Sequence, residues 1–300
     1  MTYDMVVIGA GIAGLTAAIY GRRANKKVLV LESRTYGGQI VSTKSIENYP
    51  AAMGISGFEF ATKIYEQAVS LGVEIKFENV MQVIDGTEKQ IKTNQNVYLA
   101  KTVVIATGSK NRTMGLANEE KLIGKGISYC ATCDGAFFKN KIVAVVGGGN
   151  TALGDALYLS DLAQKVYMIH RREQFSGEAA LVEQIQARSN VEIIPNAQVV
   201  ELWGEKQLTG VKISQNGVEK QLIVDGLFVA VGRVPENEKF ANLVELDQHG
   251  YIIADESCQT GTAGIFVAGD CRTKTVRQLV TAAGDGAVAA TNAIKYLNQL

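Results

Sequence analysis

The chain has 300 residues, 47% of them apolar, which is enough to fill one large or two ordinary hydrophobic cores. Its 30 basic and 30 acidic side chains balance, so the charge pattern gives no reason to expect a nucleic-acid or membrane-surface partner. We see neither a signal-peptide pattern at the start nor a run of the roughly 20 apolar residues that a membrane span needs. We therefore expect a cytoplasmic protein.

Residues 3–32 predict a first nucleotide-binding unit. YDMVVIGA is typical of a buried strand, a glycine-rich run then opens a helix, and KVLVLE is a second strand that ends at Glu32. The glycines permit a tight turn and the approach of a pyrophosphate to the helix N-terminus, while Glu32 suits a ribose diol. A glycine turn without a ligand is the alternative. The candidate contacts are Gly9, Gly11, Ile12, Ala13, Gly14, Glu32 and the following Ser33.

Residues 141–172 repeat this pattern with one difference. The strand KIVAVV leads into a GGGNTA turn and a helix, and the next strand, KVYMIH, ends in two arginines instead of an acid. Arginines bind a 2′-phosphate that an acid would repel, so this unit predicts NADPH. Its candidate contacts are Gly147, Gly149, Asn150, Thr151, Ala152, His170, Arg171 and Arg172.

Two dinucleotide units in one chain indicate a flavin and a nicotinamide. The segment 261–270 supports the flavin, because it forms an apolar strand that ends in Gly269-Asp270. Similar strands at 103–109 and 227–233 bracket the second unit, which predicts an inserted domain. We expect an α/β fold of two Rossmann-like, three-layer ββα domains: residues 1–112 with 235–300 bind FAD, and residues 113–234 bind the nicotinamide nucleotide.

The motif Cys130-Ala131-Thr132-Cys133-Asp134 is the predicted chemical centre. Cysteines at this spacing close a small disulfide ring, and the adjacent Asp134 is placed to manage the proton of a thiolate. Zinc would need two further ligands at matching spacing, and Cys258 and Cys271 do not form a second such pair. An inert buried pair is the other alternative. We predict a redox-active dithiol and no metal.

The pair lies in the predicted inner domain, fourteen residues before Gly147. One flavin face cannot hold both the dithiol and the nicotinamide at once if both come from the same domain. A hinge at the two crossovers is the simplest mechanical answer.

These motifs together resemble bacterial low-molecular-weight thioredoxin reductases over essentially the whole chain. The similarity lies in Gly9–Gly14, in CATCD at 130–134, in GGGNTA at 147–152, in HRR at 170–172 and in the C-terminal GD…RQ residues. The resemblance implies FAD, a homodimer, thioredoxin as partner and a large domain rotation. It also implies that Cys133 faces the flavin, that Cys130 attacks the thioredoxin disulfide and that Asp134 is the general acid. Flavin contacts are implied at Gly38, Gln39, Asn48, Ala106, Thr107, Gly108, Gly269, Asp270, Arg277, Gln278, Leu279 and Ala282.

Two departures from that family concern the electron donor. Ser176 stands where a third arginine is usual, and Gly154 stands where the first of two acids is usual. Ser176 can offer one hydroxyl hydrogen bond but lacks the guanidinium that grips phosphate. NADPH thus remains the predicted donor, with a ferredoxin-dependent enzyme of the same fold as the alternative. A sensing flavoprotein and a dithiol oxidase are more distant alternatives for the function.

Overall fold

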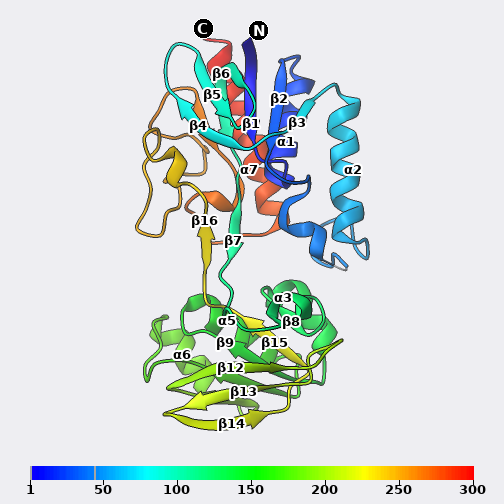
Figure 1. The fold of residues 1–300 in the computed structure, drawn as a ribbon, viewed down its shortest axis with the longest axis vertical. Coiled ribbons are helices and arrows are strands. Elements are labelled where there is room, and N and C mark those ends of the chain that lie inside the picture. Colours follow the sequence, from blue (N-terminus) through cyan, green and yellow to red (C-terminus); the bar gives the residue numbers. More distant parts are fainter. Residues whose placement is uncertain (1, 44) are drawn as a thin grey trace. The chain divides into compact units, whose positions relative to one another are not determined.

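The computed structural model describes residues 2–43 and 45–300. The chain divides into two compact units, one made of Met1–Lys110 with Val234–Leu300 and the other of Asn111–Arg233. Both crossings between the units lie in a two-stranded ribbon, formed by β7 (Ser109–Asn111) and β16 (Arg233–Pro235) (Figure 1). The backbone therefore passes from one unit to the other within these two short strands.

The first unit is built on a mixed sheet in the order β3-β2-β1-β6-β5-β4. Strands β3, β2, β1 and β6 run parallel, and one edge of β6 is shared, since β5 pairs with its first half and β17 pairs in parallel with its last three residues. The strands are β1 (Thr2–Ile8), β2 (Val28–Glu32), β3 (Glu74–Phe77), β4 (Val80–Ile84), β5 (Lys89–Thr93), β6 (Val97–Ile105) and β17 (Ile265–Val267).

Side chains of β1 alternate between two cores, as expected for a strand buried on both faces. Met5 and Val7 pack with the helices α1 (Ile12–Arg23), α2 (Gly57–Ser70) and α7 (Leu279–Leu297). Val6 and Ile8 pack on the opposite face against the segment that contains Phe240. Helices α1 and α7 lie side by side (Figure 1) on the same face of the sheet.

The second unit has an all-parallel sheet in the order β11-β10-β9-β15-β8. Helices α5 (Asn150–Ser160) and α6 (Ala179–Gln186) cover one face, and the antiparallel sheet β12-β13-β14 covers the other. The parallel strands are β8 (Ile127–Ser128), β9 (Ile142–Val146), β10 (Lys165–Ile169), β11 (Val191–Ile194) and β15 (Gly226–Val229). The outer strands are β12 (Ala197–Trp203), β13 (Gly210–Gln215) and β14 (Val218–Leu222), and two short helices are α3 (Glu119–Leu122) and α4 (Ala131–Asp134). The predicted α/β class is confirmed.

Within residues 2–43 and 45–300, no helix has both the length and the apolar character that crossing a membrane requires.

Candidate active site

In the first unit, four parallel strands end at the same edge of the sheet. β1, β2, β6 and β17 are followed there by the segments that begin at Gly9, Ser33, Ala106 and Ala268. Ligands of open α/β sheets bind at this carboxyl edge. The fold therefore brings predicted flavin contacts from four distant parts of the sequence to one place.

The first glycine turn has little room for side chains on its inner side. A Cβ on Gly9, whose φ is +112°, would lie 2.4 Å from the carbonyl oxygen of Ala106, and one on Gly14 would lie 1.9 Å from the carbonyl oxygen of Gly9. A Cβ on Gly11 would meet nothing within 4 Å, and no described side chain caps α1, which begins next to it. An open, uncapped helix N-terminus fits the pyrophosphate of a dinucleotide such as FAD.

Glu32 lies beside this turn, at the end of β2. Its Oε2 accepts a hydrogen bond of 2.9 Å from the Ala10 amide, and its Oε1 accepts one of 2.9 Å from the Arg34 amide. Each carboxylate oxygen can accept a further hydrogen bond. Glu32 is thus held by the backbone in the position that a partner of a ribose diol needs.

Several of the other predicted flavin contacts make hydrogen bonds at this edge. The side-chain amide of Gln39 donates to the Ser109 carbonyl, and Asn48 Nδ2 donates to Gln278 Oε1 over 3.1 Å. Arg277 donates to the carbonyl of Asp270 at 3.4 Å. Gly38 lies against Gly11, Ala282 is buried close to Gly269, and Leu279 begins α7.

Two further residues, which the sequence analysis did not identify, support this edge of the sheet. Thr107 Oγ1 donates to Oδ1 of Asn237 at 3.2 Å, and the fully buried Asn237 side chain donates to the carbonyls of Gly250 and Cys271. The ring of Tyr251 lies 4.1 Å from the guanidinium carbon of Arg277. Asn237 and Tyr251 each contact residues that are distant in the sequence, so neither forms part of a short sequence motif.

In the second unit, the second glycine turn follows β9. A Cβ on Gly147 would lie 2.4 Å from the Ala230 carbonyl oxygen, and one on Gly148 would lie 2.1 Å from the ring of His170. His170 is buried, stacks on Phe175 and has Nε2 2.9 Å from the Gln174 carbonyl oxygen. This is a packing position beneath the turn, where the sequence analysis expected a nucleotide contact. Arg171 and Arg172, in contrast, are exposed.

The loop after β10 is fastened to this turn. The Ser176 amide and hydroxyl both donate to the Gly148 carbonyl, over 2.8 and 3.1 Å. Asn150 accepts from the Glu178 amide at 2.7 Å and donates to the Glu178 carboxylate at 2.8 Å. The proton of the Ser176 hydroxyl is therefore already engaged, in contrast to the expectation that it is offered to a 2′-phosphate. Of the other predicted contacts, Gly149 precedes α5, Thr151 is exposed and Ala152 is buried.

Helix α5 carries a single acid where two are usual in the resembling family. A Cβ on Gly154 would meet nothing within 4 Å, so the missing side chain leaves open space. Asp155 is half-buried, and burial raises its pKa to about 7 while Arg233 partly opposes the rise. A fraction of this acid therefore carries a proton near neutral pH.

Cys130 and Cys133 form a disulfide, as predicted, with their Cα atoms 5.3 Å apart. Both are half-buried, and Cys130 directly precedes the short helix α4. Strand β8, which leads to Cys130, and strand β9, which leads to the second glycine turn, both pair in parallel with β15. The disulfide and the predicted nicotinamide site therefore follow the same edge of one sheet.

Ser128 connects Asp134 to the backbone of this disulfide. Its hydroxyl accepts a 3.1 Å hydrogen bond from the Cys130 amide and donates one of 2.6 Å to Asp134 Oδ2. Ser128 is buried, so this arrangement is shielded from competing water. The sequence analysis missed Ser128, and its only signal was a hydroxyl two residues before the first cysteine.

Tyr129 anchors the same segment from its other side. Its hydroxyl donates to Oε1 of the buried Glu119 over 2.7 Å. The Glu119 carboxylate also accepts from the amides of Met114 and Gly115, at 2.9 Å each, and of Leu116 at 3.3 Å. Burial and the hydrogen bond to Glu119 raise the pKa of Tyr129, so its hydroxyl stays protonated as a donor.

The other two cysteines are fully buried in the first unit. Burial raises the pKa of Cys258 to about 12 and also raises that of Cys271, so neither is a thiolate near neutral pH. Across the described residues, no group of three or more His, Cys, Asp or Glu side chains is placed to hold a metal ion.

The chain is similar to known proteins over nearly its full length. A family model described as pyridine nucleotide-disulphide oxidoreductase matches residues 3–286. A thioredoxin reductase of Listeria monocytogenes is 43% identical over 99% of this chain and 95% of its own length. The crystal structure of thioredoxin reductase from Streptococcus pyogenes superposes with a TM-score of 0.94 at 39% identity, covering 100% of this chain and 99% of that one.

A ferredoxin-flavin thioredoxin reductase from Clostridium acetobutylicum is 32% identical, covers 100% of this chain and 99% of its own, and has a TM-score of 0.55. Full-length identity of this size, together with the disulfide and the two glycine turns, decides the family. The chain belongs to the pyridine nucleotide-disulphide oxidoreductases and, within them, to the bacterial thioredoxin reductases of low molecular weight.

Proposed function

We propose that this protein is a thioredoxin-disulfide reductase that carries FAD and takes its electrons from NADPH. The observation that carries the proposal is the Cys130–Cys133 disulfide, which follows the same sheet edge as the second glycine turn and is joined to Asp134 through Ser128. The names of the relatives at about 40% identity support thioredoxin as the substrate.

Residues of the first unit fit FAD, which supplies two-electron chemistry between a nicotinamide and a disulfide. The uncapped N-terminus of α1 would bind its pyrophosphate, and Glu32 would accept hydrogen bonds from its ribose. The segments around Gln39, which bonds to Ser109, and around Asn48 and Gln278, which bond to each other, would hold the remainder.

The disulfide exchange itself uses only this chain and its substrate. Two electrons and a proton convert the Cys130–Cys133 disulfide into one thiolate and one thiol. The Cys130 thiolate attacks the disulfide of thioredoxin, which forms a mixed disulfide and releases one thioredoxin thiolate. Asp134 passes the proton of the Cys133 thiol to this thioredoxin thiolate, so Cys133 becomes a thiolate. The Cys133 thiolate then attacks the Cys130 sulfur, which re-forms the internal disulfide and releases the second thioredoxin sulfur as a thiolate that takes a proton from water.

Exposed arginines at the end of β10 support NADPH as the donor. Arg171 and Arg172 stand where a 2′-phosphate would lie, and β10 does not end in an acid. Ferredoxin has less support, because the more similar relatives are named thioredoxin reductase without mention of it.

We further propose that the protein is a homodimer and that it lies in the cytoplasm, where thiols stay reduced. We also propose a rotation about the β7–β16 ribbon that exchanges the disulfide and the nicotinamide at the flavin.

Trapping of the mixed disulfide tests this proposal. Cys133→Ser removes the resolving sulfur, so its Cys130 should combine with a thioredoxin that keeps one active-site cysteine, activated with thionitrobenzoate. We expect a stoichiometric covalent adduct on a non-reducing gel, loss of turnover and unchanged FAD content. Cys258→Ala is the matched control and should turn over within about twofold of wild type, since its thiol is not ionised. A colourless protein that cannot be reconstituted with FAD, or an adduct on Cys258, contradicts the proposal.

A further inference from the structure

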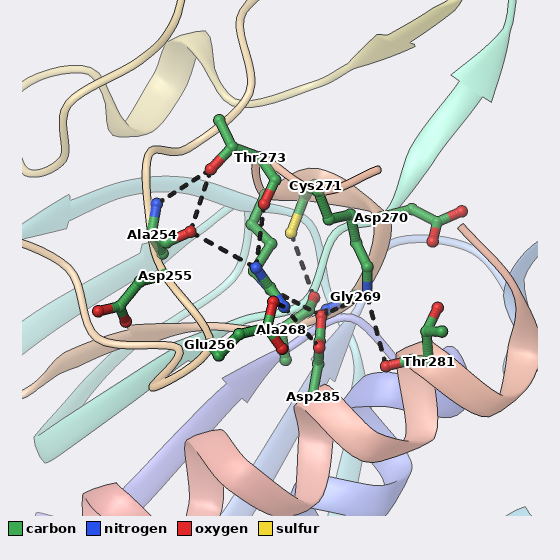
Figure 2. Close-up of polar contacts among 12 residues, drawn as sticks. Ala254, Asp255, Glu256, Ala268, Gly269, Asp270, Cys271, Thr273, Thr281 and Asp285 are labelled. Carbon is green, nitrogen blue, oxygen red and sulfur yellow. Dashed lines mark hydrogen bonds and ion pairs between the residues drawn. The ribbon is translucent and has the colours of Figure 1, made fainter. Parts of the chain in front are cut away.

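A cluster of buried charges lies between the segment that joins β17 to α7 and the helix α7 itself, where Figure 2 labels Asp285. We define the Asp285 cluster as Asp285, Arg272 and Lys274. Asp285 accepts from Arg272 through both oxygens, at 2.8 and 2.9 Å, and from Lys274 Nζ at 2.8 Å. Their side chains are 8%, 2% and 6% exposed, so one carboxylate balances two cations almost out of contact with water.

The charge of Asp285 is required by this arrangement. Burial alone would raise the pKa of Asp285, but the hydrogen bonds from Arg272 and Lys274 outweigh it and hold that pKa below its ordinary value. The only other acid bonded to Arg272 among the described residues is Glu256, at 3.3 Å and 95% exposed. Without Asp285, Arg272 would keep only the exposed Glu256 as an acidic partner, and Lys274 would lose the acid to which it is bonded, which is costly.

Asp285 also hydrogen-bonds to the backbone of the turn at Gly269. Its Oδ2 accepts a 2.9 Å hydrogen bond from the amide of Gly269. Gly269 has φ +82°, and a Cβ there would lie 2.9 Å from the Cβ of Ala13 in the first turn of α1. Figure 2 shows the Asp285 side chain reaching from its helix toward Gly269. The left-handed turn is thereby fixed against the helix whose N-terminus fits a pyrophosphate.

The cluster holds the other end of the same segment as well. Lys274 Nζ donates to the Thr281 carbonyl at 3.4 Å, and the Thr281 hydroxyl accepts from the Gln278 amide at 3.1 Å, which caps α7. Arg272 donates to its neighbour's carbonyl, that of Thr273, at 3.0 Å. Residues 269–278, which include four predicted flavin contacts, are thus tied to α7 at both ends.

We propose that Asp285 is a positioning residue for the cofactor: together with Arg272 and Lys274 it preorganises residues 269–278 to receive FAD. The inference rests on the proposed function, because it takes FAD as the ligand of this segment. Asp285 acts through Gly269 and not by touching the cofactor. Binding to a segment that is already ordered costs less conformational entropy, so the cluster raises the affinity for FAD.

The test measures the segment and the cofactor separately, in the full chain. Asp285→Asn keeps the shape of the side chain but removes its charge, and Glu256→Gln removes the exposed charge on the same arginine as a control. We expect Asp285→Asn to speed amide exchange across residues 269–278 in protein stripped of FAD. It should also weaken FAD binding, followed by quenching of flavin fluorescence, by about tenfold or more. Glu256→Gln should change both by less than about twofold.

Lys274→Met provides a second variant in case Asp285→Asn does not fold, since it leaves the Arg272–Asp285 pair intact. We expect faster exchange in the same segment and FAD binding weakened by about threefold to tenfold. Unchanged exchange and unchanged FAD affinity in the folded variants overturn the inference. If wild-type protein binds no FAD, the proposed function fails instead, and exchange in residues 269–278 still shows whether the cluster orders the segment.

Discussion

The hydroxyl of Ser128 contacts both a cysteine of the disulfide and the proposed general acid. It accepts a hydrogen bond from the amide of Cys130 and donates one to Asp134, so it fixes the backbone at Cys130 and the side chain of Asp134. Because it is buried, loss of the hydroxyl would leave a shielded amide without its acceptor.

Ser128→Ala should therefore slow thioredoxin reduction by about tenfold while FAD content stays unchanged. The measurement is the rate of thioredoxin reduction in single turnover, started from enzyme whose disulfide has been reduced. Ser128→Thr keeps a hydroxyl and is expected to recover most of the rate. Equal losses in both variants would assign Ser128 to packing alone.

Glu119 stabilises the folded segment that leads to Cys130. Its buried carboxylate accepts from three backbone amides and from the hydroxyl of Tyr129. Glu119→Gln replaces one acceptor oxygen by an NH₂ group that faces these donors, so we expect a loss of about 2–3 kcal/mol in the free energy of unfolding. Chemical denaturation measures it, and the exposed neighbour Glu120 provides a matched control as Glu120→Gln, with an effect below about 0.5 kcal/mol. Equal effects would show that the amide contacts contribute nothing.

Residue types that carry chemistry could be predicted from the sequence, but their partners could not. The CATCD motif identified Cys130 and Cys133, and they form the expected disulfide. Ser128, Glu119 and Asn237 act through hydrogen bonds that only the folded chain brings within reach. His170 shows the converse, because a motif position packs beneath a turn in the core.

At the scale of elements, helices α1 and α7 approach so closely that one position must be glycine. A Cβ on Gly286 would lie 2.2 Å from the carbonyl oxygen of Ala13, which is backbone and cannot rotate away. Gly284 lies two residues earlier in the same helix, is exposed and has nothing within 4 Å of an added Cβ.

Gly286→Ala and Gly284→Ala should therefore shift stability in opposite directions. The first forces α1 and α7 apart, with a cost of about 1–3 kcal/mol. The second adds a better helix former at an open site and stabilises by about 0.5–1 kcal/mol. Thermal unfolding of the two variants side by side checks the pair, and a stabilised Gly286→Ala would show that the helices do not pack as described.

Long, periodic elements were predictable, whereas the shortest ones were not. The strand expected at KVYMIH is β10, and the apolar strand expected in 261–270 is β17. Strand β8 has two residues and helix α4 has four, so neither spans enough sequence to show a period. Both of these elements position Cys130, which is why its surroundings needed the structure.

At the scale of the whole molecule, the order of the two nucleotide units was readable because each carries its own glycine turn between a strand and a helix. The sequence did not predict that β5 and β17 both pair with the same edge of β6. The β6–β17 pairing joins strands that are far apart in the sequence. The β7–β16 ribbon that contains both unit boundaries likewise joins strands far apart in the sequence. Non-local pairing leaves no periodic trace.

The electron donor is a property of the whole enzyme, and the residue whose substitution tests the proposed donor most directly is Ser176. Its hydroxyl proton is bound to the Gly148 carbonyl, so the 2′-phosphate of NADPH would meet Arg171 and Arg172 without a third cation. Ser176→Arg adds a guanidinium that binds phosphate bidentately. We expect the apparent KM for NADPH to fall by about tenfold and that for NADH to stay nearly constant, because only NADPH carries the phosphate.

Anaerobic titration with NADPH, NADH and reduced ferredoxin, followed by flavin bleaching, completes the test of the donor. Ser176→Ala separates the effect of the added cation from loss of the Ser176–Gly148 hydrogen bond, and it should leave the preference between the two nucleotides unchanged. Equal gains for NADPH and NADH in Ser176→Arg would place the 2′-phosphate elsewhere. Bleaching by reduced ferredoxin alone, in wild type and in Ser176→Arg, would mean that the second glycine turn no longer serves a nucleotide and that electrons enter from a protein donor.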